Sequence, residues 1–197
     1  MAEFTDRWLA SFGKPELHGA WIIFGESGSG KTHFAMELLK YLSNFVAKGA
    51  YDTLEQGMSF SFQRAWNDAN MAEAGSKVIV LNKEQLPELR ERLRKRRSPQ
   101  VIVIDSITAM SGFTRSLFGS LLNDFPDKLF IFIAHEENGS PYPTIARHVR
   151  KLSDVKIRVE GFKAYVTTRF ACDEGGGEDF VIWEEGAARY YAKETDN

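Results

Sequence analysis

The stretch that decides the fold runs from Gly19 to Lys40 and reads GAWIIFGESGSGKTHFAMELLK. Residues 20–24 form an apolar run, a glycine-rich segment follows at 25–32, and apolar residues then recur with helical spacing from Phe34 onward. The pattern predicts a buried strand, then a loop, then a helix.

The loop at 25–32 has the composition of a phosphate-binding loop. Its glycines permit backbone angles closed to other residues, so successive N–H groups can turn inward around an anion. The helix that follows adds the positive end of its dipole, Lys31 adds a charge for the β and γ phosphates, and Thr32 adds a hydroxyl for Mg²⁺. The alternative is a glycine turn that arose by chance. The predicted nucleotide-binding residues are Gly25, Glu26, Ser27, Gly28, Ser29, Gly30, Lys31, Thr32 and His33.

Length and composition predict one cytoplasmic domain. The chain has 197 residues, of which 43% are hydrophobic and 26% charged, which suits a single packed core and an ordinary polar surface. The net charge of −2 gives no overall attraction to nucleic acid or to acidic membranes, so any such binding must be local. The sequence has no apolar run near the about 20 residues that span a bilayer. The single cysteine, Cys172, has no partner for a disulfide and no neighbours at metal-ligand spacing.

Two acidic residues come at or near the ends of predicted strands. Residues 101–106 form an apolar strand that ends in Asp105, and residues 49–57 read as a short strand with Glu55 near its end. In a parallel sheet both carboxylates emerge at the edge where the phosphate loop lies. Asp105 can then hold Mg²⁺, directly or through water. For each carboxylate the alternative is a helix cap.

A histidine ends a further buried strand. Residues 128–134 read as a buried strand that leads into His135, which is well placed to sense a γ phosphate. The equally weighted alternative is a histidine that only makes hydrogen bonds at a strand end. A loop is expected at 138–143 and a basic segment at 145–152.

Other segments complete an α/β pattern. One face of residues 4–12 is aromatic and apolar, which predicts a helix docked on the core. Helices are also expected at 58–71, 86–97 and 111–122, and a buried strand at 77–82. The helix at 86–97 ends in arginine and lysine residues, which suit either a nucleic-acid patch or, as we favour, a solvated helix end.

The C-terminal part, residues 153–192, changes character and predicts β hairpins. Turns are expected at the glycines 175–177 and 186. The predicted strands are Asp154–Glu160, Lys163–Phe170, Phe180–Trp183 and Arg189–Ala192.

Together these motifs resemble the RecA-like ATPases. The likeness covers about residues 15–192 and is strongest to single-domain RecA-like nucleotide-binding proteins of bacteriophages and mobile elements. The strand that ends Asp-Thr-Leu-Glu at 52–55 points to this group among phosphate-loop proteins. The resemblance implies a single three-layer α/β domain over residues 1–197, with a mainly parallel central sheet and C-terminal antiparallel β hairpins. Residues 1–18 would be an N-terminal helix and lead-in.

The resemblance also implies roles for individual residues. Glu55 would be the general base that polarises the attacking water, and His135 would occupy the sensor position. Arg169 lies where relatives carry an arginine finger that reaches the next subunit's nucleotide, although Thr167 replaces their lysine. Such a finger implies a homo-oligomer, either a ring or a filament.

The function expected is that of a Mg²⁺-dependent ATPase acting in DNA recombination or replication. Single-stranded DNA is a possible partner, but the loops that touch DNA in recombinase-like relatives correspond to residues 108–115 and 136–147, and the second opens with Glu136 and Glu137. Two alternatives are a nucleotide-gated binding module with little hydrolysis and a phosphotransferase acting on a small substrate. No guanine-selective motif is present, so adenine is preferred.

Overall fold

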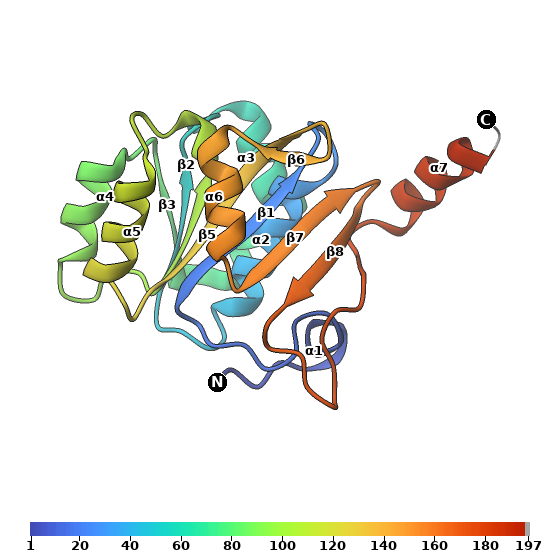
Figure 1. Cartoon of the computed structure of the whole chain (residues 1–197), viewed down its shortest axis with the longest axis horizontal. Coiled ribbons are helices and arrows are strands. Elements are labelled where there is room, and N and C mark those ends of the chain that lie inside the picture. Colours follow the sequence, from blue (N-terminus) through green and yellow to red (C-terminus); the bar gives the residue numbers. More distant parts are fainter. Residues whose placement is uncertain (196–197) are drawn as a thin grey trace.

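A mostly parallel sheet forms the centre of the molecule, and helices lie on both of its faces (Figure 1). The computed structural model describes residues 1–195. The sheet order is β3-β2-β4-β5-β1-β7-β8-β9, and β6 pairs with β5. The strands of the described part are β1 (Gly19–Gly25), β2 (Gly49–Thr53), β3 (Val78–Leu81), β4 (Val101–Asp105), β5 (Leu129–Glu137), β6 (Ser140–Tyr142), β7 (Val155–Glu160), β8 (Lys163–Thr168) and β9 (Phe180–Val181).

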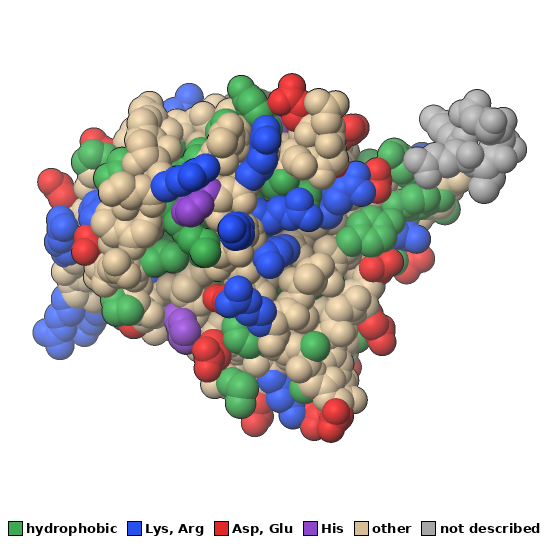
Figure 2. All heavy atoms as spheres, viewed as in Figure 1, with side chains coloured by type: hydrophobic (Ala, Val, Ile, Leu, Met, Phe, Trp, Pro, Cys, Tyr) green, Lys and Arg blue, Asp and Glu red, His purple; other side chains and the backbone are tan. Residues whose placement is uncertain are grey.

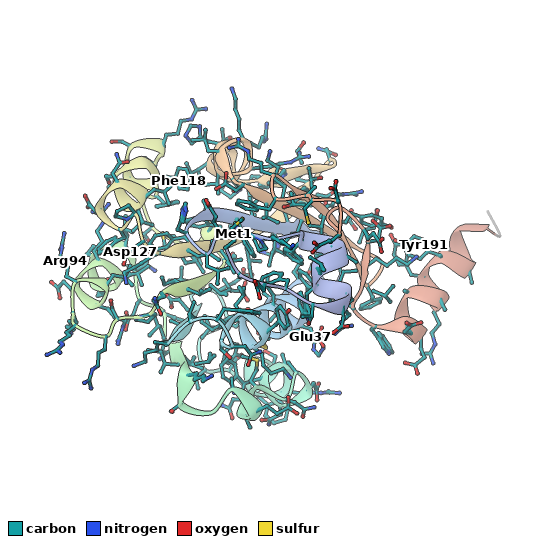
Figure 3. All side chains as sticks on the ribbon, turned by 90° about the horizontal axis from the view of Figure 1, so that it is seen from below. Met1, Glu37, Arg94, Phe118, Asp127 and Tyr191 are labelled. Carbon is teal, nitrogen blue, oxygen red and sulfur yellow. The ribbon has the colours of Figure 1, made fainter. Side chains whose placement is uncertain are left out.

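The helices make two layers with separate cores. The helices α1, α2 and α3 form one layer, whose core contains Phe34 of α2 and Ile23 of β1. The helices α4, α5 and α6 form the other layer, whose core contains Phe118 of α5 and Ile22 of β1. Figure 3 shows Phe118 of α5 and Glu37 of α2 on opposite sides of the sheet. The helices are α1 (Asp6–Phe12), α2 (Lys31–Leu42), α3 (Phe60–Asp68), α4 (Leu86–Leu93), α5 (Arg115–Asp124), α6 (Thr144–Leu152) and α7 (Glu184–Thr195), with 3₁₀ turns at Met71–Lys77 and Ile107–Ala109.

Strand register places the phosphate loop, Asp105 and His135 at one edge of the sheet. The parallel strands β1, β2, β4 and β5 all end at the same edge, with Gly25 opposite His135 and Thr53 opposite Asp105. Continuous runs of apolar residues, such as Val101 to Ile104, fit strands that are buried on both faces. The carboxyl edge of the sheet therefore carries the phosphate loop and the ends of three other strands.

The N-terminal helix docks as predicted. Trp8 and Phe12 of α1 are buried, and the Trp8 ring stacks on Tyr41 of α2 with centroids 4.7 Å apart. Phe4, just before the helix, is buried as well, and Leu9 packs against the same core.

The prediction for the C-terminal part is correct for the antiparallel strands and wrong for its last segment. Strands β7 and β8 pair antiparallel, and β9 adds a third strand of only two residues. The predicted strand Arg189–Ala192 is instead part of α7, which projects from the body (Figure 1). Gly186 lies inside this helix rather than in a turn; a Cβ there would lie 2.1 Å from the Trp183 ring. Acidic residues in the first turn and the alanines that follow favour the helix.

The segment predicted as a loop at 138–143 is partly a strand. β5 continues to Glu137, two residues beyond His135, and turns back as β6, which pairs with it in antiparallel register. Asn138 and Gly139 make the turn with positive φ. None of the helices in residues 1–195 is long and apolar enough to cross a membrane.

Candidate nucleotide-binding and catalytic site

The phosphate loop joins β1 to α2 and is shaped by two of its glycines. Gly25 approaches the backbone so closely that an added Cβ would lie 2.1 Å from the carbonyl oxygen of Val159. Gly30 is the N-cap of α2 and has a φ of 105°, in the region that favours glycine. No side chain caps α2, so the N–H groups of its first turn can bind an anion.

A buried hydroxyl inside the loop supports the same ligand. Ser29 is 9% exposed, and its Oγ has no hydrogen-bond partner among the described residues. A buried polar atom without a partner is costly, and a bound phosphate oxygen would relieve that cost. The unpaired hydroxyl and the uncapped helix therefore both fit a phosphate.

Lys31 is held over the loop. Its side chain is buried, and Nζ donates a hydrogen bond of 2.5 Å to the carbonyl oxygen of Glu26. Burial lowers the pKa of Lys31 from its ordinary value, while the charges of Asp105 and Glu55 oppose that change. Lys31, Asp105 and Glu55 line the same cavity.

Asp105 lies at the end of β4 in a nearly closed environment. One of its oxygens, Oδ2, accepts hydrogen bonds from the Tyr51 hydroxyl at 2.6 Å and from the Thr32 hydroxyl at 3.3 Å. Burial raises the pKa of Asp105, and the bond from Tyr51 opposes this rise. Tyr51 is itself completely buried in β2, so its hydroxyl holds the same carboxylate oxygen that Thr32 contacts.

The residues present fit a magnesium ion bound together with a nucleotide. Mg²⁺ prefers oxygen ligands and is commonly held by one or two protein groups plus phosphates and water. The Thr32 hydroxyl and the Asp105 carboxylate supply oxygen atoms next to the phosphate loop. The described residues contain no cluster of three or more metal-binding side chains, so the substrate's phosphates would have to complete the coordination.

Glu55 makes two hydrogen bonds beside Asp105. Its Oε2 accepts from the Ser106 hydroxyl at 2.8 Å and lies 3.0 Å from Nε2 of His135. The backbone N–H of Glu55 donates to the carbonyl oxygen of Asp105 at 3.0 Å, which ties the end of β2 to β4. The predicted base and the predicted sensor are therefore in direct contact.

The environment keeps the Glu55 carboxylate ionised. Partial burial acts to raise its pKa, but the hydrogen bonds from Ser106 and His135, with the charge of Lys31, outweigh burial and lower the pKa below the ordinary value. Both of these hydrogen bonds are made by Oε2, the same oxygen of the carboxylate.

A cavity of about 350 Å³ joins these groups. His33 lines it at the start of α2 and lies 3.8 Å from a carboxylate oxygen of Glu37. The residues that line the cavity are Ser27, Gly28, Gly30, Lys31, Thr32, His33, Glu55, Gln56, Ala65, Asp105, Ser106, Ile133 and His135.

Arg169 is the predicted site residue that the fold keeps apart from the others. It follows β8, its guanidinium lies 3.1 Å from Asp154, and its side chain is 62% exposed. Asp154 comes just before β7, and its N–H binds the carbonyl oxygen of Ala20, so Arg169 is at the sheet edge opposite to the phosphate loop. Within one chain it cannot join the cavity.

Two contributors to the site were missed by sequence reasoning. Tyr51 lies in the middle of a strand, and only the pairing of β2 with β4 shows that it reaches Asp105. Ser106 carries a weak signal, because it directly follows an acidic residue at a strand end that faces the phosphate loop.

Comparisons with known proteins identify the fold. No protein-family model and no curated protein matches the chain. Among solved structures, the flagellar accessory protein FlaH from Methanocaldococcus jannaschii has a TM-score of 0.60 and 17% identity, covering 86% of this chain and 90% of its own. A second solved structure, an ATPase domain, has a TM-score of 0.56 and 13% identity, covering 86% of this chain and 83% of its own. A KaiC-like protein of Pyrococcus horikoshii OT3 has a TM-score of 0.56 and 17% identity, covering 81% of this chain and 82% of its own. The chain has the fold of the RecA-like phosphate-loop ATPases.

Proposed function

We propose that the protein binds ATP with Mg²⁺ and hydrolyses the bond between its β and γ phosphates. The observation that carries this proposal is the shared cavity, where Lys31, the Thr32–Asp105 pair and the Glu55–His135 pair all meet. Likeness to solved structures at 13–17% identity supports the fold, and the reaction is inferred from the side chains.

Each group has a defined task in this reaction. Glu55 accepts a proton from a water molecule as its oxygen attacks the γ phosphorus, while the bond from that phosphorus to the bridging oxygen breaks and ADP leaves. Lys31 and the N–H groups of the loop stabilise the negative charge on the phosphate oxygens. A bound Mg²⁺, held by Thr32 and by Asp105 or its water, would supply further charge stabilisation.

A second candidate function is a nucleotide-gated binding module with little hydrolysis. The observation that favours it is the double engagement of Glu55 by Ser106 and His135. If ATP does not draw His135 toward the γ phosphate, the base stays occupied and turnover is slow. The two functions share a binding site. They differ in whether Glu55 is released from these hydrogen bonds to act as a base.

Single-turnover hydrolysis of radiolabelled ATP by the Glu55→Gln variant tests the proposal. A glutamine retains the shape and can still accept both hydrogen bonds, but it is not a base, so we expect ATP binding to remain and hydrolysis to fall by about 10²–10⁴-fold. Glu137→Gln is the matched control, because Glu137 is exposed on β5 two residues beyond His135. Full hydrolysis by Glu55→Gln would refute the assignment of the base, and negligible turnover by the unmodified protein would favour the binding module.

The proposal includes a homo-oligomer in which Arg169 serves a neighbouring subunit. Its exposure and its distance from the cavity of its own chain suit a group that acts on another nucleotide. We expect activity per subunit to rise with protein concentration, and Arg169→Ala to abolish that rise. Arg64→Ala, which removes another exposed ion-paired arginine, is the control. An unchanged concentration dependence for Arg169→Ala would exclude a finger in trans.

A further inference from the structure

The helix α6 and the hairpin beside it concentrate positive charge in a chain whose net charge is −2. Residues 144–159 contain five lysines and arginines and a single acid, Asp154. Figure 2 shows Lys and Arg side chains in a row over α6 and across onto the β7–β8 hairpin. We call the following five residues the basic strip: Arg147, Arg150, Lys151, Lys156 and Lys163.

The hairpin presents an uncovered face to this row. Alternate residues of β7, such as Val155 and Ile157, enter the core on the α1 and α2 side. Lys156 lies opposite Ile22 in parallel register and therefore points to the other face, the one on which α6 packs. In Figure 1 no helix lies over β7 and β8 on that face within the described residues.

The two flanks of α6 have different contacts. The ring of His148 packs edge-on against Phe118 of α5, with centroids 6.0 Å apart. The guanidinium of Arg150 lies 4.8 Å from the ring centroid of Phe24, which is in β1, the strand next to β7. The arginine flank of α6 therefore faces the uncovered hairpin, and the strip is one continuous surface.

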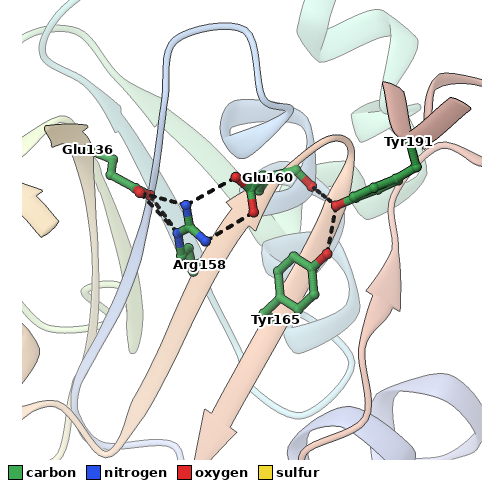
Figure 4. Close-up of polar contacts among 5 residues, drawn as sticks. All are labelled: Glu136, Arg158, Glu160, Tyr165 and Tyr191. Atoms are coloured by element: carbon green, nitrogen blue, oxygen red, sulfur yellow. Dashed lines mark hydrogen bonds and ion pairs between the residues drawn. The ribbon is translucent and has the colours of Figure 1, made fainter. Parts of the chain in front are cut away.

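Acidic side chains of the described residues leave the charge of the strip unneutralised, while Arg150 and Lys163 each lie over an aromatic ring. Two nearby arginines outside the strip are neutralised within the chain. Arg169 is paired with Asp154, and Arg158 is paired with Glu136 and Glu160 (Figure 4). No cation of the strip forms an ion pair with any of the described residues. Unpaired like charges in a row repel one another, and an anionic ligand relieves that repulsion.

We propose that the basic strip binds single-stranded nucleic acid. Cations of the strip would contact successive phosphates, since side chains two residues apart on a strand lie about 7 Å apart and a helix turn rises about 5 Å. Two tyrosines lie at the hairpin end, where the Tyr165 and Tyr191 hydroxyls are 2.6 Å apart and Lys163 Nζ is 4.6 Å from the Tyr191 ring centroid. Aromatic rings beside cations suit unpaired bases, which can stack on them.

The strip suits nucleic acid better than an anionic membrane. A helix that binds a lipid surface inserts a row of apolar side chains into it. In α6 the apolar residues Ala146 and Val149 are buried against the sheet, and Leu152 at the end of the helix is its single large exposed hydrophobic residue. The surface therefore offers charge and aromatic rings but little to insert.

The number of cations sets the expected salt dependence. If all five cations release counterions from a single strand, the logarithm of the association constant falls with the logarithm of the salt concentration with a slope of about −3.5. A rise in salt concentration of about fourfold then weakens binding about 100-fold. Loss of three cations should reduce the slope to about −1.4 and weaken binding at low salt by about tenfold or more.

Fluorescence anisotropy with labelled oligo(dT) and oligo(rU) of about 30 nucleotides tests the proposal. The strip variant combines Arg147→Gln, Lys151→Gln and Lys156→Gln. The control combines Arg94→Gln, Lys95→Gln and Arg96→Gln, which removes the same charge from exposed residues just beyond α4. We expect the strip variant to bind the oligonucleotides more weakly and with a smaller salt dependence. The control should bind like the unmodified protein.

Several outcomes would overturn the inference. Equal binding by the two variants would show that position on the surface does not matter, and absence of oligonucleotide binding by the unmodified protein would exclude the site. Binding to phosphatidylserine vesicles but not to oligonucleotides would assign the strip to a lipid surface. The inference is independent of the proposed ATPase, since Lys31→Ala should lose ATP binding and keep oligonucleotide binding.

Discussion

Asp52→Asn should gain stability relative to the unmodified protein as the pH rises from about 5 to 8. Asp52 is fully buried in β2; its Oδ1 accepts a hydrogen bond of 3.2 Å from the N–H of Glu84, and its Oδ2 has no partner among the described residues. Burial, opposed by this bond and aided by the charge of Glu84, raises the pKa of Asp52 from 3.8 to about 7. An asparagine keeps the acceptor for Glu84 and carries no charge.

The sign and size of the effect follow from this pKa. The carboxyl binds its proton more tightly in the folded state. Between about pH 4 and pH 7, folding is therefore accompanied by the uptake of a proton. The stability that this provides is fully present below about pH 4 and is lost progressively as the pH rises to about 7. Between about pH 5 and pH 8 the loss amounts to about 2.5 kcal/mol.

Urea unfolding at these two pH values measures the effect. We expect the free energy of unfolding of Asp52→Asn, relative to the unmodified protein, to increase by about 2.5 kcal/mol from about pH 5 to pH 8. Its absolute value also contains the cost of a new buried amide donor, but that cost is the same at both pH values. Asp68→Asn on the surface of α3 gives the baseline for the same chemical change. A relative stability of Asp52→Asn that matches this baseline at both pH values would refute the reasoning.

Further substitutions test the geometry of the site and the helices. Tyr51→Phe removes a hydrogen bond to a buried carboxylate, so it should lower the free energy of unfolding by about 1.5–3 kcal/mol and raise the pKa of Asp105 further; Mg²⁺-dependent binding of an ATP analogue should then require a higher pH. Unchanged pH dependence of that binding would contradict this role for Tyr51. Gly25→Ala places a Cβ 2.1 Å from the Val159 carbonyl oxygen and should abolish nucleotide binding in calorimetry. Gly119→Ala in α5 meets no atom within 4 Å and should raise stability by about 0.5–1 kcal/mol, measured as a higher Tm.

The phosphate loop and the strand ends could be predicted because their positions are fixed by local sequence. The change from an apolar run to glycines determines where β1 ends, and Asp105 closes an apolar run of the length of one strand. Parallel strands then bring these ends to one edge whatever the details of packing. The contact between Glu55 and His135 also depends on the end of β2 being tied to β4, which no spacing in the sequence reveals.

The last segment, which forms α7, could not be predicted, because short segments satisfy helix and strand patterns equally well. Arg189 to Ala192 include two adjacent tyrosines, which favour a strand, yet Glu184 and Glu185 begin a helix that includes them. Gly186 is a turn former in sequence, but in the structure it packs against Trp183. Arg169 shows a related limit: its place in the chain matches a motif, and only the fold shows that it lies away from the cavity.

The end of β5 contacts both the candidate nucleotide site and β7, the strand that also carries Lys156 of the basic strip. His135 contacts Glu55 in the cavity, and the next residue, Glu136, buries its carboxylate against Arg158 of β7, with distances of 2.8–3.0 Å. Successive strand residues point to opposite faces, so a displacement of this strand end by a γ phosphate moves both contacts. Since coupling between two binding sites is reciprocal, any change in oligonucleotide affinity caused by an ATP analogue must equal the change in analogue affinity caused by the oligonucleotide. The strength of the link between the two sites can therefore be measured from either one.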